Sequence, residues 1–144
     1  MGTAAHDTDL AAWALETARA LREGRISDVS MDEVAEELEE MARSQRRELV
    51  SRLSVLLAHL LKWRHQAERR SRSWHTTVTR ERQEVAALLK ESPSLRRTVA
   101  SVLADAYQRG AGLAASETGL PEETFPAECP FSVEQALDPG FWPE

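Results

Sequence analysis

Apolar residues recur at helical spacing along most of the chain, and no segment shows the alternation that is typical of a β-strand. The first helical pattern follows Asp7 or Thr8, either of which can cap a helix, and Gly24 is suited to end it. The second begins with a capping box at Ser30 and continues to about His65 without glycine or proline. Its apolar face is formed by Val34, Leu38, Met41, Leu49, Leu53, Leu56, Leu60 and Trp63.

Two further helical patterns follow. The third runs from about Trp74 to Glu91, with Ser71 or Ser73 as its cap. Ser92-Pro93 ends it and starts a fourth, which closes at Gly119-Leu120-Pro121. We therefore predict one all-α domain over residues 1–144, with a bundle of four main helices over about 7–119 and a long, central second helix.

The segment after Pro121 differs from a free acidic tail. It holds four of the six prolines, a short capping-box helix at Ser132, and four large aromatic residues. Disordered tails are poor in aromatic residues, so we expect residues 120–144 to form an irregular strap that packs on the bundle. The aromatic residues are Phe125, Phe131, Phe141 and Trp142.

Small residues mark two places where helices can approach closely. Ser51, Ser54 and Ala58 share a stripe of the second helix, and Gly110-Ala111-Gly112 interrupts the fourth. A stripe without bulk fits an internal helix better than a subunit interface, which usually presents aromatic and methionine anchors. We expect an internal helix to cover the stripe and the protein to be a monomer, with a homo-oligomer as the alternative.

Charge is segregated, although the net charge is only −6. Six acids and no base lie between Asp32 and Glu40, whereas seven bases and two acids lie between Lys62 and Arg82. With 29% charged and 42% hydrophobic residues, the composition is that of a globular protein. Three features favour a cytoplasmic protein without a membrane segment. The chain has one cysteine, it has no apolar run near the ~18 residues of a membrane span, and its N-terminus lacks the basic and then apolar pattern of a secretory signal.

The basic segment holds the candidate site. Arg69, Arg70 and Arg72 lie between Trp63 and Trp74, and guanidinium groups bind phosphates while indoles stack on bases. One hypothesis is therefore a binder of nucleic acid or another polyanion through residues 62–82. The favoured interpretation is internal: the arginines pair with the chain's own acids, in the tail or at Glu37 and Glu40, and the tryptophans lie in the core. The negative net charge supports that choice.

An enzyme or metal protein built on Glu and His is a second alternative. Glu33 and Glu36 have the i, i+3 spacing of bundle metal ligands, but no Glu-x-x-His occurs. His59 and His65 point about 240° apart on a helix, so they do not share one ion, and we expect His59 to be a hydrogen-bonded core or edge residue. Cys129 follows an acid, which does not activate a thiol. We predict no catalytic residue, no metal and no cofactor.

Several of these strings occur together in one known family. They are Glu36-Glu37-Leu38-Glu39-Glu40-Met41, His59-Leu60-Leu61-Lys62-Trp63, Glu68-Arg69-Arg70-Ser71-Arg72-Ser73-Trp74 and Glu117-Thr118-Gly119-Leu120-Pro121. With them the chain resembles a bacterial family catalogued as domain of unknown function twenty-nine. The resemblance implies an all-helical single domain without an established activity. Ala67 stands where the family more often has proline, which leaves the exact end of the second helix open.

Together these features favour a non-catalytic interaction module in the cytoplasm, with a macromolecular partner that the sequence does not identify.

Overall fold

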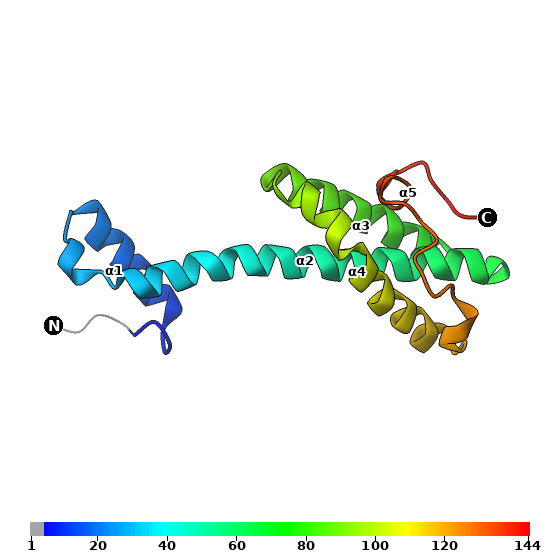
Figure 1. The fold of residues 1–144 in the computed structure, drawn as a ribbon, viewed down its shortest axis with the longest axis horizontal. Coiled ribbons are helices and arrows are strands. Elements are labelled where there is room, and N and C mark those ends of the chain that lie inside the picture. The colour runs from blue at the N-terminus through cyan, green and yellow to red at the C-terminus, as the bar shows by residue number, and fades with distance from the viewer. Residues whose placement is uncertain (1–4) are drawn as a thin grey trace. The chain divides into compact units, whose positions relative to one another are not determined.

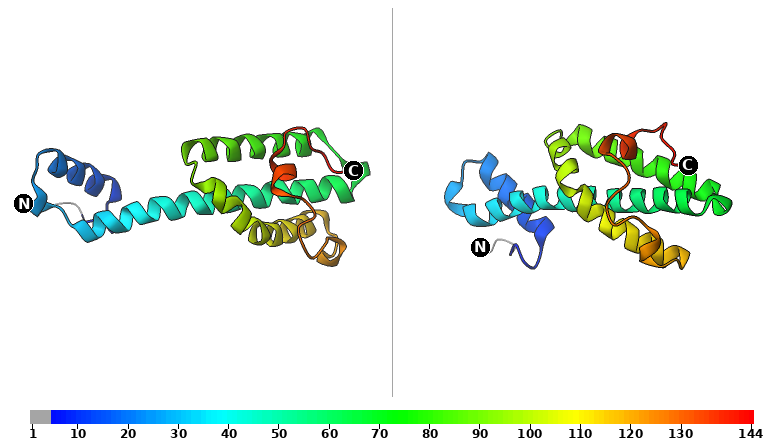
Figure 2. Two further views of the ribbon diagram at one scale, coloured as in Figure 1. Left: turned by 45° about the horizontal axis from the view of Figure 1, so that its top comes forward. Right: turned by 45° about the vertical axis from the view of Figure 1, so that its right-hand side comes forward.

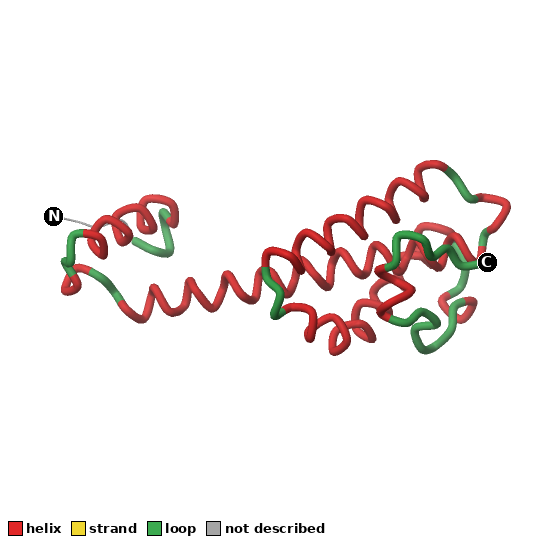
Figure 3. The backbone as a smooth tube through the Cα atoms, turned by 90° about the horizontal axis from the view of Figure 1, so that it is seen from above, coloured by secondary structure: helices red, strands yellow, loops and turns green. Residues whose placement is uncertain are grey.

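The computed structural model describes residues 5–144, and within them every regular element is helical (Figure 1). Figure 3 shows helices joined by loops, with no strand in that part of the chain. The prediction of an all-α fold with four main helices is confirmed. The α-helices are α1 (Leu10–Arg22), α2 (Met31–His65), α3 (Arg72–Glu91), α4 (Leu95–Thr118) and α5 (Val133–Leu137). The 3-10 turns are η1 (Ile26–Asp28), η2 (Ala67–Arg69) and η3 (Glu122–Thr124).

Local capping fixes the ends of the helices. The cap of α1 is Asp9, whose carboxylate accepts the Ala12 N–H, and not Asp7 or Thr8 as predicted. The reason is a turn before the helix, in which the N–H groups of Thr8 and Asp9 both donate to Ala5 O. Ser30 and Ser71 cap α2 and α3 as expected, each through its hydroxyl oxygen.

Two glycines end helices in the left-handed conformation that other residues avoid. Gly24, after α1, has φ +75°, and Gly119, after α4, has φ +77°. Helix α2 ends at His65, just before the turn at Ala67, which settles the end that the sequence left open.

By its backbone contacts the chain divides into two compact units. Unit 1 extends to Arg43 and unit 2 runs from Ser44 to Glu144, so helix α2 contributes its first part to one and the rest to the other. The expectation of one domain over residues 1–144 stays a prediction.

Unit 1 contains α1, η1 and the first turns of α2 (Figure 2). Trp13 and Ala20 are the buried residues among those described in this unit. The His6 ring lies edge-on to Trp13, with 4.5 Å between ring centroids, and its Nε2 is 2.7 Å from Glu37 Oε2. This contact joins the segment before α1 to α2, but it encloses little apolar surface.

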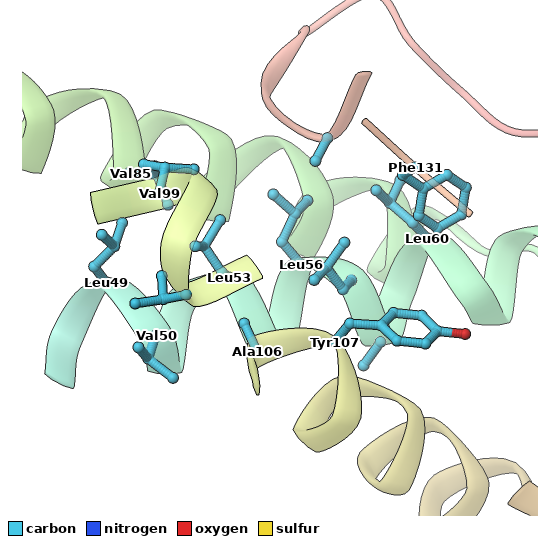
Figure 4. Close-up of a cluster of buried hydrophobic side chains, with 14 of the residues drawn as sticks. Leu49, Val50, Leu53, Leu56, Leu60, Val85, Val99, Ala106, Tyr107 and Phe131 are labelled. Atoms are coloured by element: carbon cyan, nitrogen blue, oxygen red, sulfur yellow. The ribbon is translucent and has the colours of Figure 1, made fainter. Parts of the chain in front are cut away.

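Unit 2 has a continuous hydrophobic core. The second part of α2 supplies fully buried leucines, among them Leu49, Leu53, Leu56 and Leu60, which Figure 4 shows beside side chains of α3 and α4. Burying each of these side chains contributes about 1.5–3 kcal/mol. The buried partners labelled in Figure 4 are Val85 from α3, Val99, Ala106 and Tyr107 from α4, and Phe131 from the strap.

Helices α2 and α4 cross closely at the predicted small residues. A Cβ added to Gly110 would lie 2.8 Å from Ser54 O and 3.2 Å from Ala58 N, so only glycine fits there. The prediction that an internal helix covers this stripe is confirmed at Ser54 and Ala58, whereas Ser51 is exposed.

The C-terminal strap packs on unit 2, as predicted. Phe125 and Phe131 are buried in the core, and Phe141 and Trp142 are partly buried against it. Helix α5 has the complete capping box: Ser132 Oγ accepts the Gln135 N–H, and the Gln135 side chain accepts the Ser132 N–H.

Candidate functional site

The predicted arginines lie in the connection between α2 and α3, and Arg70 is the one that is held in place. Its Nε donates to Trp63 O at 2.7 Å and its Nη2 to Pro143 O at 3.4 Å. The guanidinium also lies over the Trp63 ring, 5.0 Å from the centroid. Its partners are thus backbone carbonyls and an aromatic face, not the carboxylates that the internal interpretation required.

Arg69 and Arg72 are exposed, and within residues 5–144 no hydrogen bond or ion pair of their side chains occurs. Arg72 is the first residue of α3, so its guanidinium lies near the positive end of a helix of 20 residues. These two side chains can bind an anion without breaking an existing bond.

An aromatic cluster adjoins the arginines. Trp63 contacts Trp142, with 4.6 Å between ring centroids, and His75 stacks on Trp142 at 4.4 Å and 14°. Trp63 and Trp142 are half-buried and His75 is exposed, so part of their ring surface faces solvent. We call Trp63, Arg69, Arg70, Arg72, His75 and Trp142 the arginine–aromatic corner.

A hollow of about 380 Å³ opens at this corner, and most of its lining comes from the corner itself. Trp63 and His75 supply aromatic walls, whereas Arg70 and Arg72 supply donors. Sequence reasoning found the arginines and Trp63 but missed His75 and Trp142. His75 could have been found from its position on α3, one turn after the Ser71 cap. No local sequence pattern indicates that Trp142 lies at this corner.

Trp74 belongs to a different contact. The Lys62 ammonium lies 4.9 Å from the centre of the Trp74 ring and 2.9 Å from Glu117 Oε1. Lys62 is only 6% exposed, so this ion pair ties α2 to the end of α4. The basic segment therefore does contain an internal ion pair, but at Lys62. Neither Trp63 nor Trp74 is part of the buried core in which both were expected; both are half-buried.

Glu37 and Glu40, which were predicted as partners of the arginines, have other partners. Glu37 pairs with His6, and Glu40 pairs with Arg43 at 3.1 Å. Both belong to unit 1, whereas the three arginines belong to unit 2. The sign of the charges alone had made them candidates, and their pairing with the arginines stays a prediction.

Arg82 is an arginine whose side chain is buried and bonded inside the fold, a role that was expected for Arg69, Arg70 or Arg72. It is 5% exposed, its Nε donates to Ala136 O at 2.8 Å, and its Nη2 donates to Phe141 O at 2.8 Å and Gln135 O at 3.3 Å. Burial lowers the pKa of this guanidinium, and Asp138 opposes the shift. Three carbonyls of the strap thus share one buried cation.

The second candidate surface lies in unit 1. Large hydrophobic side chains that are exposed occur, among the described residues, only between positions 10 and 41. They are Leu10, Leu15, Leu21, Ile26, Met31, Leu38 and Met41. Such a concentration is unusual for a free surface and marks contact sites in other proteins.

The two units also differ in charge. Unit 1 has 11 acids and 4 bases, a net charge of −7 with histidine neutral, whereas unit 2 has 13 acids and 14 bases, a net charge of +1. The negative charge of the chain is therefore a property of unit 1 and gives no argument against anion binding in unit 2.

Other sites considered from the sequence have ordinary surroundings. His59 Nδ1 lies 2.9 Å from Val55 O, and burial lowers its pKa, which confirms the expectation of a hydrogen-bonded histidine. Cys129 is half-buried, and burial raises the pKa of its thiol. Among residues 5–144 no three His, Cys, Asp or Glu side chains gather as a metal site would require. In the same part of the chain, no helix has the length and apolar character needed to span a membrane.

The fold and its surfaces define an all-α domain in which a helical core is joined to an acidic helical segment with apolar side chains exposed. The chain belongs to the family described as Domain of unknown function DUF29, whose model matches residues 5–142. No curated protein and no solved structure matches it significantly.

Proposed function

We propose that this chain is a non-catalytic interaction module of the cytoplasm, and that unit 1 binds an amphipathic helix of a partner protein. The observation that carries the proposal is that the seven large hydrophobic side chains exposed within residues 5–144 all belong to unit 1. Unit 2, by contrast, covers its apolar residues with its own helices.

The exposed side chains form stripes of the kind that helix-binding surfaces use. Met31, Leu38 and Met41 lie within about 80° of one another on α2, together with half-buried Val34. On α1, Leu10 and Leu21 lie about 20° apart, whereas Leu15 lies about 140° from Leu10. Leu15 is thus a solitary exposed leucine, which is common on protein surfaces.

Charge indicates the chemistry of the partner. Of the six acids between Asp32 and Glu40, Glu37 and Glu39 flank the α2 stripe and the other four lie on the opposite side of the helix. Unit 1 carries a net charge of −7. A helix with lysine or arginine beside an apolar face complements that surface, whereas a second copy of unit 1 meets like charge. We therefore propose that this surface binds a basic helix of a partner protein and that the chain itself is a monomer.

Two model peptides test the assignment. Each has about 18 residues, or five helical turns, with leucine on one face; the other face carries lysine in one peptide and glutamate in the other. Fluorescence anisotropy should show binding of the lysine peptide that weakens with salt, and little binding of the glutamate peptide. Equal binding of both peptides, or of neither, contradicts the proposal.

Variants locate the binding surface. The double variant Leu38→Ser/Met41→Ser should weaken peptide binding about tenfold, because it removes two apolar anchors. Leu15→Ser removes an equally exposed leucine from another side of α1 and should leave binding unchanged. If light scattering instead finds a dimer that the double variant dissociates, the partner is a second copy and the assignment to a basic helix is wrong.

A further inference from the structure

We infer that the arginine–aromatic corner of unit 2 binds single-stranded nucleic acid. This site is separate from the unit 1 surface and does not depend on the function proposed for it. Proteins that bind single strands without sequence preference combine guanidinium groups for the phosphates with aromatic rings on which bases stack. Both components meet here, where the end of α2, the connection to α3, the first turn of α3 and the end of the strap lie together.

The phosphate-binding part consists of three guanidinium groups, two of them without a side-chain partner among the described residues and one held in place. Arg69 and Arg72 are exposed and, within the described residues, have no side-chain partner. Arg70 is fixed by its two carbonyl bonds and by Trp63, so it loses little freedom when an anion arrives. The start of α3 adds its helix dipole at Arg72.

The base-binding part is the exposed ring of His75 together with the solvent-facing parts of Trp63 and Trp142, which are half-buried. The Trp142 ring is held by His75 and by the Arg82 guanidinium, which lies 5.5 Å from its centroid. A second hollow, of about 370 Å³, includes Arg64 and Trp142 in its lining. The Trp63–Trp142 contact and the Arg70–Pro143 hydrogen bond join the two hollows. Two adjoining hollows that both contain an arginine and an indole suit consecutive nucleotides of a strand better than one small anion.

Acidic groups near the corner are few. Glu144 lines the second hollow, and Glu68 lies in the turn before Arg69. The same region has four arginines, and the net charge of unit 2 is +1. The arginines are Arg64, Arg69, Arg70 and Arg72. The local charge therefore favours a polyanion even though the whole chain is acidic.

The test uses the full chain and a labelled single-stranded DNA of about 16 nucleotides, the upper end of the site size of small single-strand binding modules. Anisotropy is measured over a range of salt concentrations. Binding should weaken with salt, and the same sequence as a duplex should bind less, because its bases are not available for stacking. Quenching of tryptophan fluorescence in the unmodified chain, to which Trp63 and Trp142 contribute two of the four tryptophans, gives an independent signal.

Matched double variants place the site. Arg69→Ala/Arg72→Ala should weaken single-strand binding about tenfold and make the slope of log affinity against log salt shallower by about 1.4, since each phosphate contact on a single strand contributes about 0.7. Arg96→Ala/Arg97→Ala removes the same charge from two exposed positions at the start of α4 and should change neither the affinity nor the slope. His75→Ala should weaken binding without changing the slope.

Three results overturn the inference. The first is an absence of both anisotropy change and quenching at low salt. The second is an equal loss in the two double variants, which indicates general charge attraction. The third is binding of the duplex, or competition by inorganic polyphosphate, as strong as that of the single strand, which excludes base stacking. Thermal unfolding by circular dichroism confirms that each variant is folded.

Discussion

Helix α2 contributes apolar residues to both units, and their surroundings differ. In unit 2, Leu49 and Leu53 are completely buried beneath α3 and α4. In unit 1, Leu38 and Met41 are 59% and 60% exposed, although they continue the same helical stripe. A hydrophobic stripe thus identifies the face of a helix that is suited to burial, but whether the same chain covers that face depends on the elements that follow.

The largest expected effect comes from truncating one leucine in each unit. Leu53→Ala should lower the free energy of unfolding by about 2–5 kcal/mol, because it leaves a cavity in the core. Leu38→Ala should change it by less than about 0.5 kcal/mol, as is usual for exposed positions. Urea unfolding followed by circular dichroism measures both. Equal losses would mean that Leu38 is covered within the free chain, and the binding surface proposed for unit 1 would lose its basis.

A second comparison concerns two arginines of α3. Arg82→Met keeps an apolar stem but removes the donor to three strap carbonyls, so it should cost about 1–3 kcal/mol, the usual penalty for unsatisfied buried polar groups. Arg72→Met should be nearly neutral, because Arg72 has no side-chain partner among the described residues. If Arg82→Met leaves the melting temperature unchanged, the strap is held by its aromatic residues alone.

These arginines also show how far the sequence alone could go. The serine caps of α2 and α3, the glycine ends of α1 and α4, the capping box of α5 and the packed strap could be predicted, since these signals act locally. The role of Arg82 could not, because its carbonyl partners lie more than fifty residues away in the chain. In the sequence it is one base among seven, whereas Arg69, Arg70 and Arg72 form the conspicuous cluster.

The same limit applies to the pairing that was predicted for Glu37 and Glu40. Total charge and the sign of each segment suggested that acids and arginines neutralise each other, whereas the structure pairs Glu37 with His6 and Glu40 with Arg43 inside unit 1. The net charge of the whole chain did not reveal that unit 1 has a net charge of −7 and unit 2 a net charge of +1. The arginine–aromatic corner was visible in the sequence only in part, because Trp142 reaches it through the fold of the strap.

Two glycines of α4 test the close helix crossing in unit 2. Alanine normally stabilises a helix over glycine by about 1 kcal/mol. At Gly110 overpacking against Ser54 O costs about 1–3 kcal/mol, so Gly110→Ala should be destabilising by up to about 2 kcal/mol in the net. At Gly112 the nearest atom to an added Cβ is Glu122 Oε1 at 3.5 Å, an ordinary contact, so Gly112→Ala should stabilise. The same sign at both positions, measured by thermal unfolding, would contradict the crossing.

The smallest expected effect is a difference in pH response between the units. The hydrogen bond to Glu37 raises the pKa of His6 above 6.5, whereas burial lowers the pKa values of His59 and His65 below it. Protonated His6 therefore stabilises unit 1 below pH 6.5, and this contribution is lost as the pH rises through the folded pKa. Neutral His59 and His65 favour the fold of unit 2 above pH 6.5, and this contribution is lost as the pH falls below that value towards the folded pKa.

Acidification from about pH 8 to about pH 5.5, the range in which histidine titrates, should thus tighten unit 1 and loosen unit 2. Titration of the histidine ring protons by NMR separates the two responses, with a midpoint above 6.5 for His6 and below 6.5 for His59 and His65. Glu37→Gln should return the pKa of His6 towards 6.5 and leave the other two unchanged, because the cause of their shifts is burial in unit 2. If all three rings titrate with one midpoint near 6.5, two features of the structure are absent in solution. These are the His6–Glu37 contact and the burial of His59 and His65.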